Sequence, residues 1–138
     1  MRTPPIGVVV TDATTPDRTT KSVRVDGEAY AGEAVAGEGA HGVDVLAADG
    51  YLFCAPEHLA SLSGPMKDFF DRCYYPALDR IGGRAYALMV CAGSDGSGAV
   101  RQVERICTGW RLRQVAPALI VCTHAQTAAA ILAPKRIA

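Results

Sequence analysis

The sequence predicts an α/β domain built on a doubly wound parallel sheet, and two observations lead to this fold class. Four short apolar runs lack polar alternation, which is typical of strands buried on both faces: residues 6–10, 50–55, 86–92 and 118–123. Segments between the later runs repeat apolar residues at helical spacing. Strand, loop, helix and strand in this order form the βαβ unit, so helices are expected on either side of the sheet.

Two helices are expected between the later strands. The first begins near Pro65, with Ser63 as a candidate N-cap, because the missing N–H of proline does no harm in a first turn. Its apolar residues fall at the i, i+3, i+4 and i+7 positions of one face: Met66, Phe69, Phe70 and Cys73. The second begins near Ser97, and its apolar stripe consists of Val100, Val103, Ile106, Cys107 and Trp110. Both stripes predict core residues.

Length, charge and cysteine usage favour one cytoplasmic domain over residues 1–138. Lysine plus arginine equal aspartate plus glutamate at 14 each, so no net charge directs the chain to nucleic acid or an anionic membrane. The five cysteines contain no CxxC pair, which argues against a metal site and suits a reducing compartment. No apolar run approaches the roughly 18 residues of a membrane span, and the N-terminal run is too short for a signal-peptide core.

Three polar loops follow the expected strands, at residues 11–20, 55–64 and 92–98. Ligands of open parallel sheets bind outside the carboxyl ends of the strands, so these loops are the candidate site. The first loop carries hydroxyls that could bind a phosphate: Thr11, Thr14, Thr15 and Thr19. It has no glycine, however, and a solvated threonine-rich turn explains it equally well. The third loop, CAGSDGSGA, has glycines that let backbone amides face a planar ligand, and Ser94 and Asp95 could bond its polar edges.

The segment from Ala47 to about Lys135 resembles the flavodoxin-like NAD(P)H-dependent FMN reductases and quinone reductases. The resemblance lies in a strand (GYLFC), a proline-containing loop (APEHLASL), a Ser-Gly-x-x-Lys helix start (SGPMK) and the FFDR that follows. It continues through GWRL and LIVCTHAQT. This resemblance implies a flavodoxin-like sheet with the strand order 2-1-3-4-5.

The resemblance also implies FMN as cofactor, with NAD(P)H as electron donor and a quinone or another small molecule as acceptor. It places the flavin ring against the second loop, at Pro56, Glu57, His58, Leu59 and Ala60. It places the pyrimidine edge of the ring against the third loop, at Ala92, Gly93, Ser94, Asp95 and Gly96. Taken alone, His58 fits a solvated or capping residue better than a catalyst, and Glu57 fits a hydrogen-bonding loop residue better than a general acid. Many members of this family are dimers or tetramers, which implies a homo-dimer or homo-tetramer here.

The N-terminal third departs from the family. TTPDRT stands where the family carries a Thr/Ser-x-Thr-Gly-x-Thr phosphate loop, and five glycines follow between residues 21 and 45. Two interpretations of that stretch are open: SVRV (Ser22–Val25) forms a strand, or EAYAGEAVA (Glu28–Ala36) forms a short helix weakened by glycine. Little sequence remains for a full final helix, and its absence would uncover the last strand and favour a partner chain.

Two classes of function follow from these observations. The first is an FMN-binding oxidoreductase that moves electrons from NAD(P)H to a quinone or other small acceptor. The alternative is a non-catalytic protein of the same fold that has lost tight FMN binding and acts through partner contacts, which the glycine-free first loop favours. A phosphate-binding α/β domain of another kind has only the threonine-rich loop in its support.

Overall fold

The computed structural model of the chain describes residues 8–11, 19–25, 28–36 and 40–133. Its strands are β1 (Val8–Thr11), β2 (Thr19–Val25), β3 (Glu28–Ala36), β4 (Gly50–His58), β5 (Ser61–Leu62), β6 (Ala85–Ala92), β7 (Arg113–Gln114) and β8 (Leu119–Cys122). Its helices are α1 (Gly42–Ala47), α2 (Gly64–Ala77), α3 (Ser97–Gly109) and α4 (Ala128–Leu132). No described helix combines the length and the apolarity needed to cross a bilayer.

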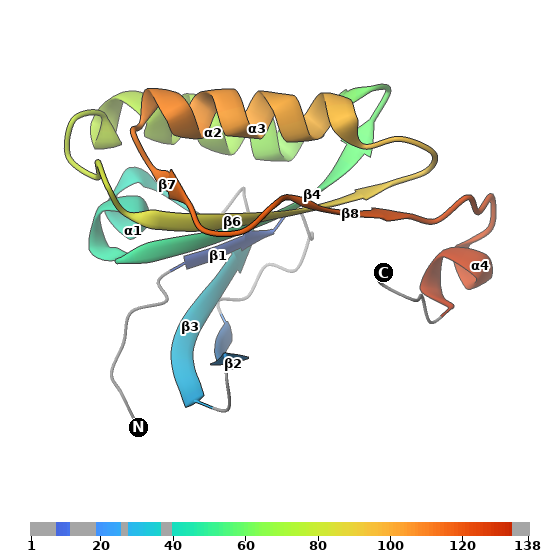
Figure 1. Cartoon of the computed structure of the whole chain (residues 1–138), viewed down its shortest axis with the longest axis horizontal. Helices are drawn as coiled ribbons and strands as arrows, with labels where there is room; N and C mark the ends of the chain where they lie inside the picture. Colours follow the sequence, from blue (N-terminus) through green and yellow to red (C-terminus); the bar gives the residue numbers. More distant parts are fainter. Residues whose placement is uncertain (1–7, 12–18, 26–27, 37–39, 134–138) are drawn as a thin grey trace.

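The sheet confirms the expected fold class. Its strands lie in the order β2-β3-β1-β4-β6-β7, while β5 pairs with β4 and β8 pairs with β6. Strands β3, β1, β4, β6 and β8 are joined by parallel pairing, and counted in chain order they lie as 2-1-3-4-5. The carboxyl ends of these strands therefore share one edge, at the right of Figure 1 for β4, β6 and β8.

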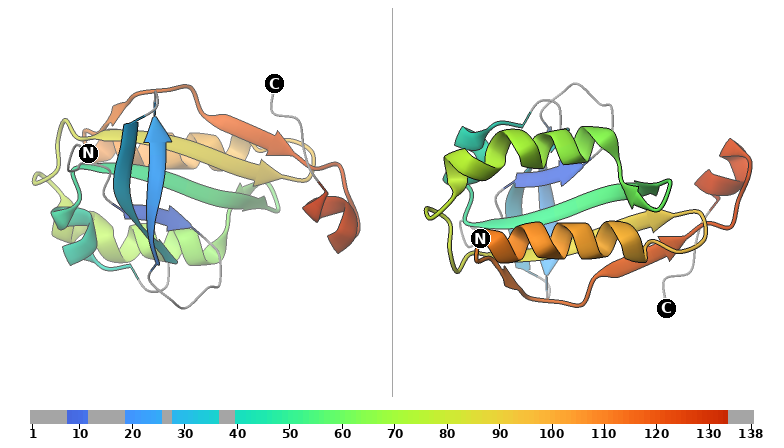
Figure 2. Two further views of the ribbon diagram at one scale, coloured as in Figure 1. Left: turned by 90° about the horizontal axis from the view of Figure 1, so that it is seen from below. Right: turned by 90° about the horizontal axis from the view of Figure 1, so that it is seen from above.

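The helix layer lies on one face of this sheet. Helices α2 and α3 run side by side above β4 and β6, and α1 packs against α2 (Figures 1 and 2). Alternate side chains of β4 and β6 point into this layer and are buried: Tyr51, Phe53, Ala55, Tyr86, Leu88, Val90 and Ala92. On the opposite face, the view from below shows the β2–β3 hairpin crossing in front of β1 and β4 (Figure 2, left). The described part of the chain places no helix there, so the expected helices on either side are found on one side only, and the strands expected to be buried on both faces alternate buried with half-buried residues.

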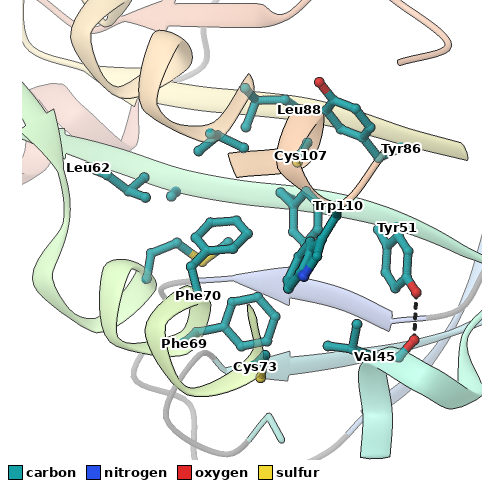
Figure 3. Close-up of a cluster of buried hydrophobic side chains, with 14 of the residues drawn as sticks. Val45, Tyr51, Leu62, Phe69, Phe70, Cys73, Tyr86, Leu88, Cys107 and Trp110 are labelled. Carbon is teal, nitrogen blue, oxygen red and sulfur yellow. Dashed lines mark hydrogen bonds between the residues drawn. The ribbon is translucent and has the colours of Figure 1, made fainter. Parts of the chain in front are cut away.

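The core confirms both predicted helical stripes. Met66, Phe69, Phe70 and Cys73 are at most 1% exposed, and the α3 stripe is buried except for the half-buried Ile106. Aromatic rings fill the centre (Figure 3), where the ring centroid of Phe53 lies 5.3 Å from that of Phe70. Trp110 closes the far end of α3, and its indole N–H donates to the Tyr74 carbonyl at 2.9 Å. Burial of such large rings contributes strongly to the stability of a core.

The expectation of a helix at Glu28–Ala36 is wrong, because this segment is strand β3. It pairs in antiparallel register with β2, which contains the expected strand Ser22–Val25, and in parallel register with β1. The pairing of Val25 with Glu28 leaves two residues between the strands, and the sequence there is Asp-Gly, a strong hairpin signal. Both segments are therefore strands, and β3 lies between β2 and β1 in the sheet.

The second expected loop is also more regular than predicted. Strand β4 continues three residues past Ala55, and β5 returns beside it, with Glu57 opposite Leu62 and His58 opposite Ser61. The region from Pro56 to Leu62 is therefore a β-hairpin. Ser63 caps α2 and Pro65 lies in its first turn, as expected, although the buried Ser63 hydroxyl makes no hydrogen bond within the described residues.

Candidate functional site

The tip of the β4–β5 hairpin is strained and exposed. Leu59 and Ala60 both have positive φ angles, 52° and 64°, as a two-residue hairpin turn requires. Glycine or asparagine normally occupies such positions, because a side chain in the left-handed region costs about 1–2 kcal/mol. The Leu59 side chain is fully exposed, and His58 beside it is exposed as well. An exposed apolar side chain on a strained turn is the kind of feature that functional sites retain.

The third loop lies at the same edge of the sheet, at the end of β6. Ala92 still belongs to β6 and is buried, while Gly93, Ser94 and Asp95 are exposed. A Cβ atom built on Gly93 would have no atom within 4 Å apart from its chain neighbours, so this loop faces open space. The His124 N–H donates to the Gly93 carbonyl at 2.9 Å and fixes the loop from the side of β8.

The second and third loops are joined through the side chain of Glu57. Its Oε1 accepts a hydrogen bond from the Gly96 N–H at 2.9 Å, and its Oε2 accepts one from the Ala99 N–H at 3.1 Å. Gly96 is the N-cap of α3 and has a φ of 92°. In Figure 1 the hairpin (green, upper right) rises from the end of β4 beside the first turn of α3. The structure thus brings these two predicted loops together and makes Glu57 a hydrogen-bonding residue.

The threonine-rich first loop falls mostly outside the described residues. Thr11 ends β1 opposite Cys54 of β4, at the same sheet edge as the other two loops. Thr14 and Thr15 lie outside the described residues. Thr19 begins β2 and pairs with Ala34, so β3 separates it from β1. The structure does not bring Thr19 together with Thr11.

Asp95, in the third loop, has a carboxyl group with a lowered pKa. Its side chain accepts a hydrogen bond from the Ser97 N–H at 3.2 Å. Hydrogen bonds from Ser97 hold the pKa of the Asp95 carboxyl below its usual value. Asp95 is therefore an anion at neutral pH, and its oxygens can accept further hydrogen bonds. No group of His, Cys, Asp and Glu side chains within the described ranges could hold a metal ion.

Two contacts of this site were not predicted, one by Gln102 and one by Gly98 of the third loop. Gln102 of α3 accepts hydrogen bonds through its Oε1 from the Leu62 N–H at 2.6 Å and from the Ser61 hydroxyl at 3.2 Å. A Cβ atom on Gly98 would overlap the Ala60 carbonyl oxygen, so only glycine lets the hairpin come this close to α3. Gly98 and Gln102 are four residues apart on one helix face, which is the sequence signal that could have revealed this contact.

The structure is an α/β fold whose candidate ligand site lies at the carboxyl edge of its parallel sheet. A family model described as NADPH-dependent FMN reductase matches residues 39–127, which is more than half of the chain. The chain therefore belongs to the NADPH-dependent FMN reductase family. No curated protein matches the sequence.

Solved structures show the same fold at low sequence identity. An oxidoreductase from Corynebacterium diphtheriae is 16% identical with a TM-score of 0.62, and the match covers 88% of this chain and 84% of that one. An NADPH-quinone reductase from P. pentosaceus is 13% identical with a TM-score of 0.58, and 95% of each chain is covered. The flavodiiron core of Flv1 from Synechocystis sp. PCC6803 is 11% identical with a TM-score of 0.60, covering 86% of this chain. This chain spans 30% of that flavodiiron chain.

Membership of the family fixes the general activity. The protein is an NAD(P)H-dependent oxidoreductase of the flavodoxin-like class, with FMN as cofactor. This is the general part of the first expected class, without its acceptor, and the comparisons do not favour the non-catalytic alternative. The family match begins at residue 39, so it covers the second and third loops and leaves the first loop outside.

Proposed function

We propose that this protein passes electrons from NAD(P)H through FMN to a quinone or a similar small acceptor. The observation that carries the proposal is the pairing of two exposed loops at one sheet edge. The β4–β5 hairpin and the third loop are tied together by Glu57, while Gly93 and Leu59 face open space. The P. pentosaceus quinone reductase, with the same fold along its length, supports a quinone as acceptor.

The residues present fit the ring of FMN. Gly93 and Ser94 are exposed, and their backbone polar groups could hold the pyrimidine edge of the ring; the ionised Asp95 could accept a hydrogen bond from a ring N–H. Leu59 offers an apolar side chain for the face of the ring. Bound FMN would supply the hydride chemistry, accepting two electrons from NAD(P)H and releasing them to the acceptor. The hairpin and the third loop would orient the ring.

For the phosphate of FMN we assign Thr11, Thr14 and Thr15. Thr11 lies at the carboxyl end of β1, which is next to β4 in the sheet. Thr19 is excluded from this assignment because it lies beyond β3. His58 is exposed at the hairpin and has room to contact the acceptor.

Two measurements test the proposed function. FMN titrated into the purified chain should lose fluorescence as it binds, with one FMN per chain. NAD(P)H-dependent reduction of a quinone should then follow ping-pong kinetics, with parallel lines in double-reciprocal plots, because both substrates use one open face. Tight FMN binding without quinone reduction would rule out the proposed acceptor, and the absence of FMN binding would rule out the assigned site.

We also propose a homo-dimer or homo-tetramer in a reducing compartment such as the cytosol. Half-buried apolar side chains lie on the sheet face opposite α2 and α3, among them Leu52, Met89 and Leu119. A second copy of the chain could cover such a face. All five cysteines are free thiols, which suits reducing conditions. Light scattering of the purified protein measures the assembly, and a strictly monomeric mass would contradict it.

A further inference from the structure

The start of helix α3 is capped by a side chain from strand β4. The first amides of a helix have no partners within the helix, and a side chain at the N-cap usually binds them. Here the N-cap is Gly96, which has no side chain. Glu57, at the end of β4, supplies both carboxylate oxygens instead, to the Gly96 N–H and the Ala99 N–H. A carboxylate at this position also interacts favourably with the positive end of the helix dipole.

Two further contacts hold the same hairpin on α3. The carbonyl of Ala60 lies against Gly98, where a larger residue could not fit. One turn further along α3, Gln102 binds the backbone of Leu62 and the hydroxyl of Ser61. The hairpin is therefore attached to α3 from its first strand, its tip and its second strand.

We propose that Glu57 is a positioning residue for the flavin ring, because it sets the distance between the two loops that would hold the ring. This inference rests on the proposed function, in which the hairpin and the third loop contact FMN. Both oxygens of Glu57 already accept hydrogen bonds, so its role is to hold backbone in place rather than to exchange protons with a substrate. The bonds also occupy the Gly96 amide, which leaves the backbone of residues 93–95 to meet the ring.

The substitution Glu57→Gln tests this role with little change in volume. The amide keeps one acceptor oxygen, but its NH2 group faces an N–H donor and repels it. Loss of one charge-assisted hydrogen bond should loosen the junction and raise the Kd for FMN about tenfold. Glu104→Gln is the matched control, because Glu104 lies further along α3 and makes no contact with either loop among the interactions described above. Its Kd should equal that of the wild type.

Riboflavin, which has the ring of FMN and lacks its phosphate, separates ring positioning from other causes. Because Glu57 holds the two loops that would contact the ring, Glu57→Gln should raise the Kd values for FMN and for riboflavin by the same factor. Near-UV circular dichroism at the titration temperature confirms that each variant is folded, and Glu57→Ala should show a larger loss if it folds. Kd values unchanged by Glu57→Gln, or a loss confined to FMN, would overturn the inference while the proposed function stands. A wild-type chain that binds neither flavin would overturn both.

Discussion

Valine substituted at Gly93 and at Gly96 should have opposite consequences, although the two glycines belong to one loop. At Gly93 the backbone needs no positive φ, and a Cβ would meet open space, so Gly93→Val should change the free energy of unfolding by about 0.5 kcal/mol at most. At Gly96 the φ is 92°, and a Cβ would lie 2.7 Å from Cγ2 of Ile120. The left-handed backbone costs a valine about 1–2 kcal/mol and overpacking adds about 1–3 kcal/mol, so Gly96→Val should cost roughly 2–5 kcal/mol.

Flavin affinity should follow a different order from stability. The valine at Gly93 would stand in the space assigned to the ring, so its Kd for FMN should rise at least about tenfold while the fold is intact. Urea unfolding followed by the fluorescence of the single, buried Trp110 gives the stability of each variant. FMN titration under native conditions gives the affinity. A Gly93→Val protein that binds FMN as tightly as the wild type would refute the assignment of the third loop. A Gly96→Val protein of wild-type stability would refute the packing described around Gly96.

Three further results are expected. Replacing Leu59 and Ala60 together by Asn and Gly should raise the free energy of unfolding by about 1 kcal/mol or more, because Asn and Gly suit a turn with positive φ angles. An unchanged urea midpoint would contradict the strain assigned to this turn. In the native protein, iodoacetamide should alkylate the exposed Cys91 and spare Cys73 and Cys107, which are 0% exposed; mass spectrometry that found all three modified at one rate would be inconsistent with the core. Burial raises the pKa of Cys73 from 9.0 to about 11, so the folded state favours the neutral thiol. The free energy of unfolding should therefore fall as the pH rises from 9.0 towards about 11, and it should fall less in Cys73→Ala. Equal slopes of this free energy against pH in the two proteins would refute this cause.

The parallel core of the fold could be predicted because periodicity and burial agree there. The apolar runs predicted β4, β6 and β8, although β4 and β6 bury one face fully and β8 is only partly buried, and the stripes of α2 and α3 match their buried faces. The β2–β3 hairpin is harder to predict from the sequence, because its glycines disfavour a helix without specifying a strand. The Asp-Gly dipeptide between the two strands was the available signal.

The loops that form the site could be predicted from the sequence, but the contacts between them could not. The sequence places His58 and Ser94 after consecutive parallel strands, which is enough to put them at one sheet edge. It gives no sign of the β4–β5 hairpin, because Leu59 and Ala60 lack the glycine or asparagine that marks such turns. Gln102 has a weak signal, its four-residue spacing from Gly98, and this spacing does not say that Leu62 packs against it; that contact is tertiary.

Amide hydrogen exchange, measured with and without FMN, tests most directly whether the flavin lies between the hairpin and the third loop. Bound FMN should slow exchange in peptides that cover residues 57–62 and 92–98, because ring contacts and the Glu57 hydrogen bonds would restrain both segments together. Exchange in the second half of α2, residues 70–77, should change little, because this part follows the hairpin by two helical turns and faces the core. Slower exchange elsewhere, with both loops unchanged, would place the flavin at another site and contradict the account.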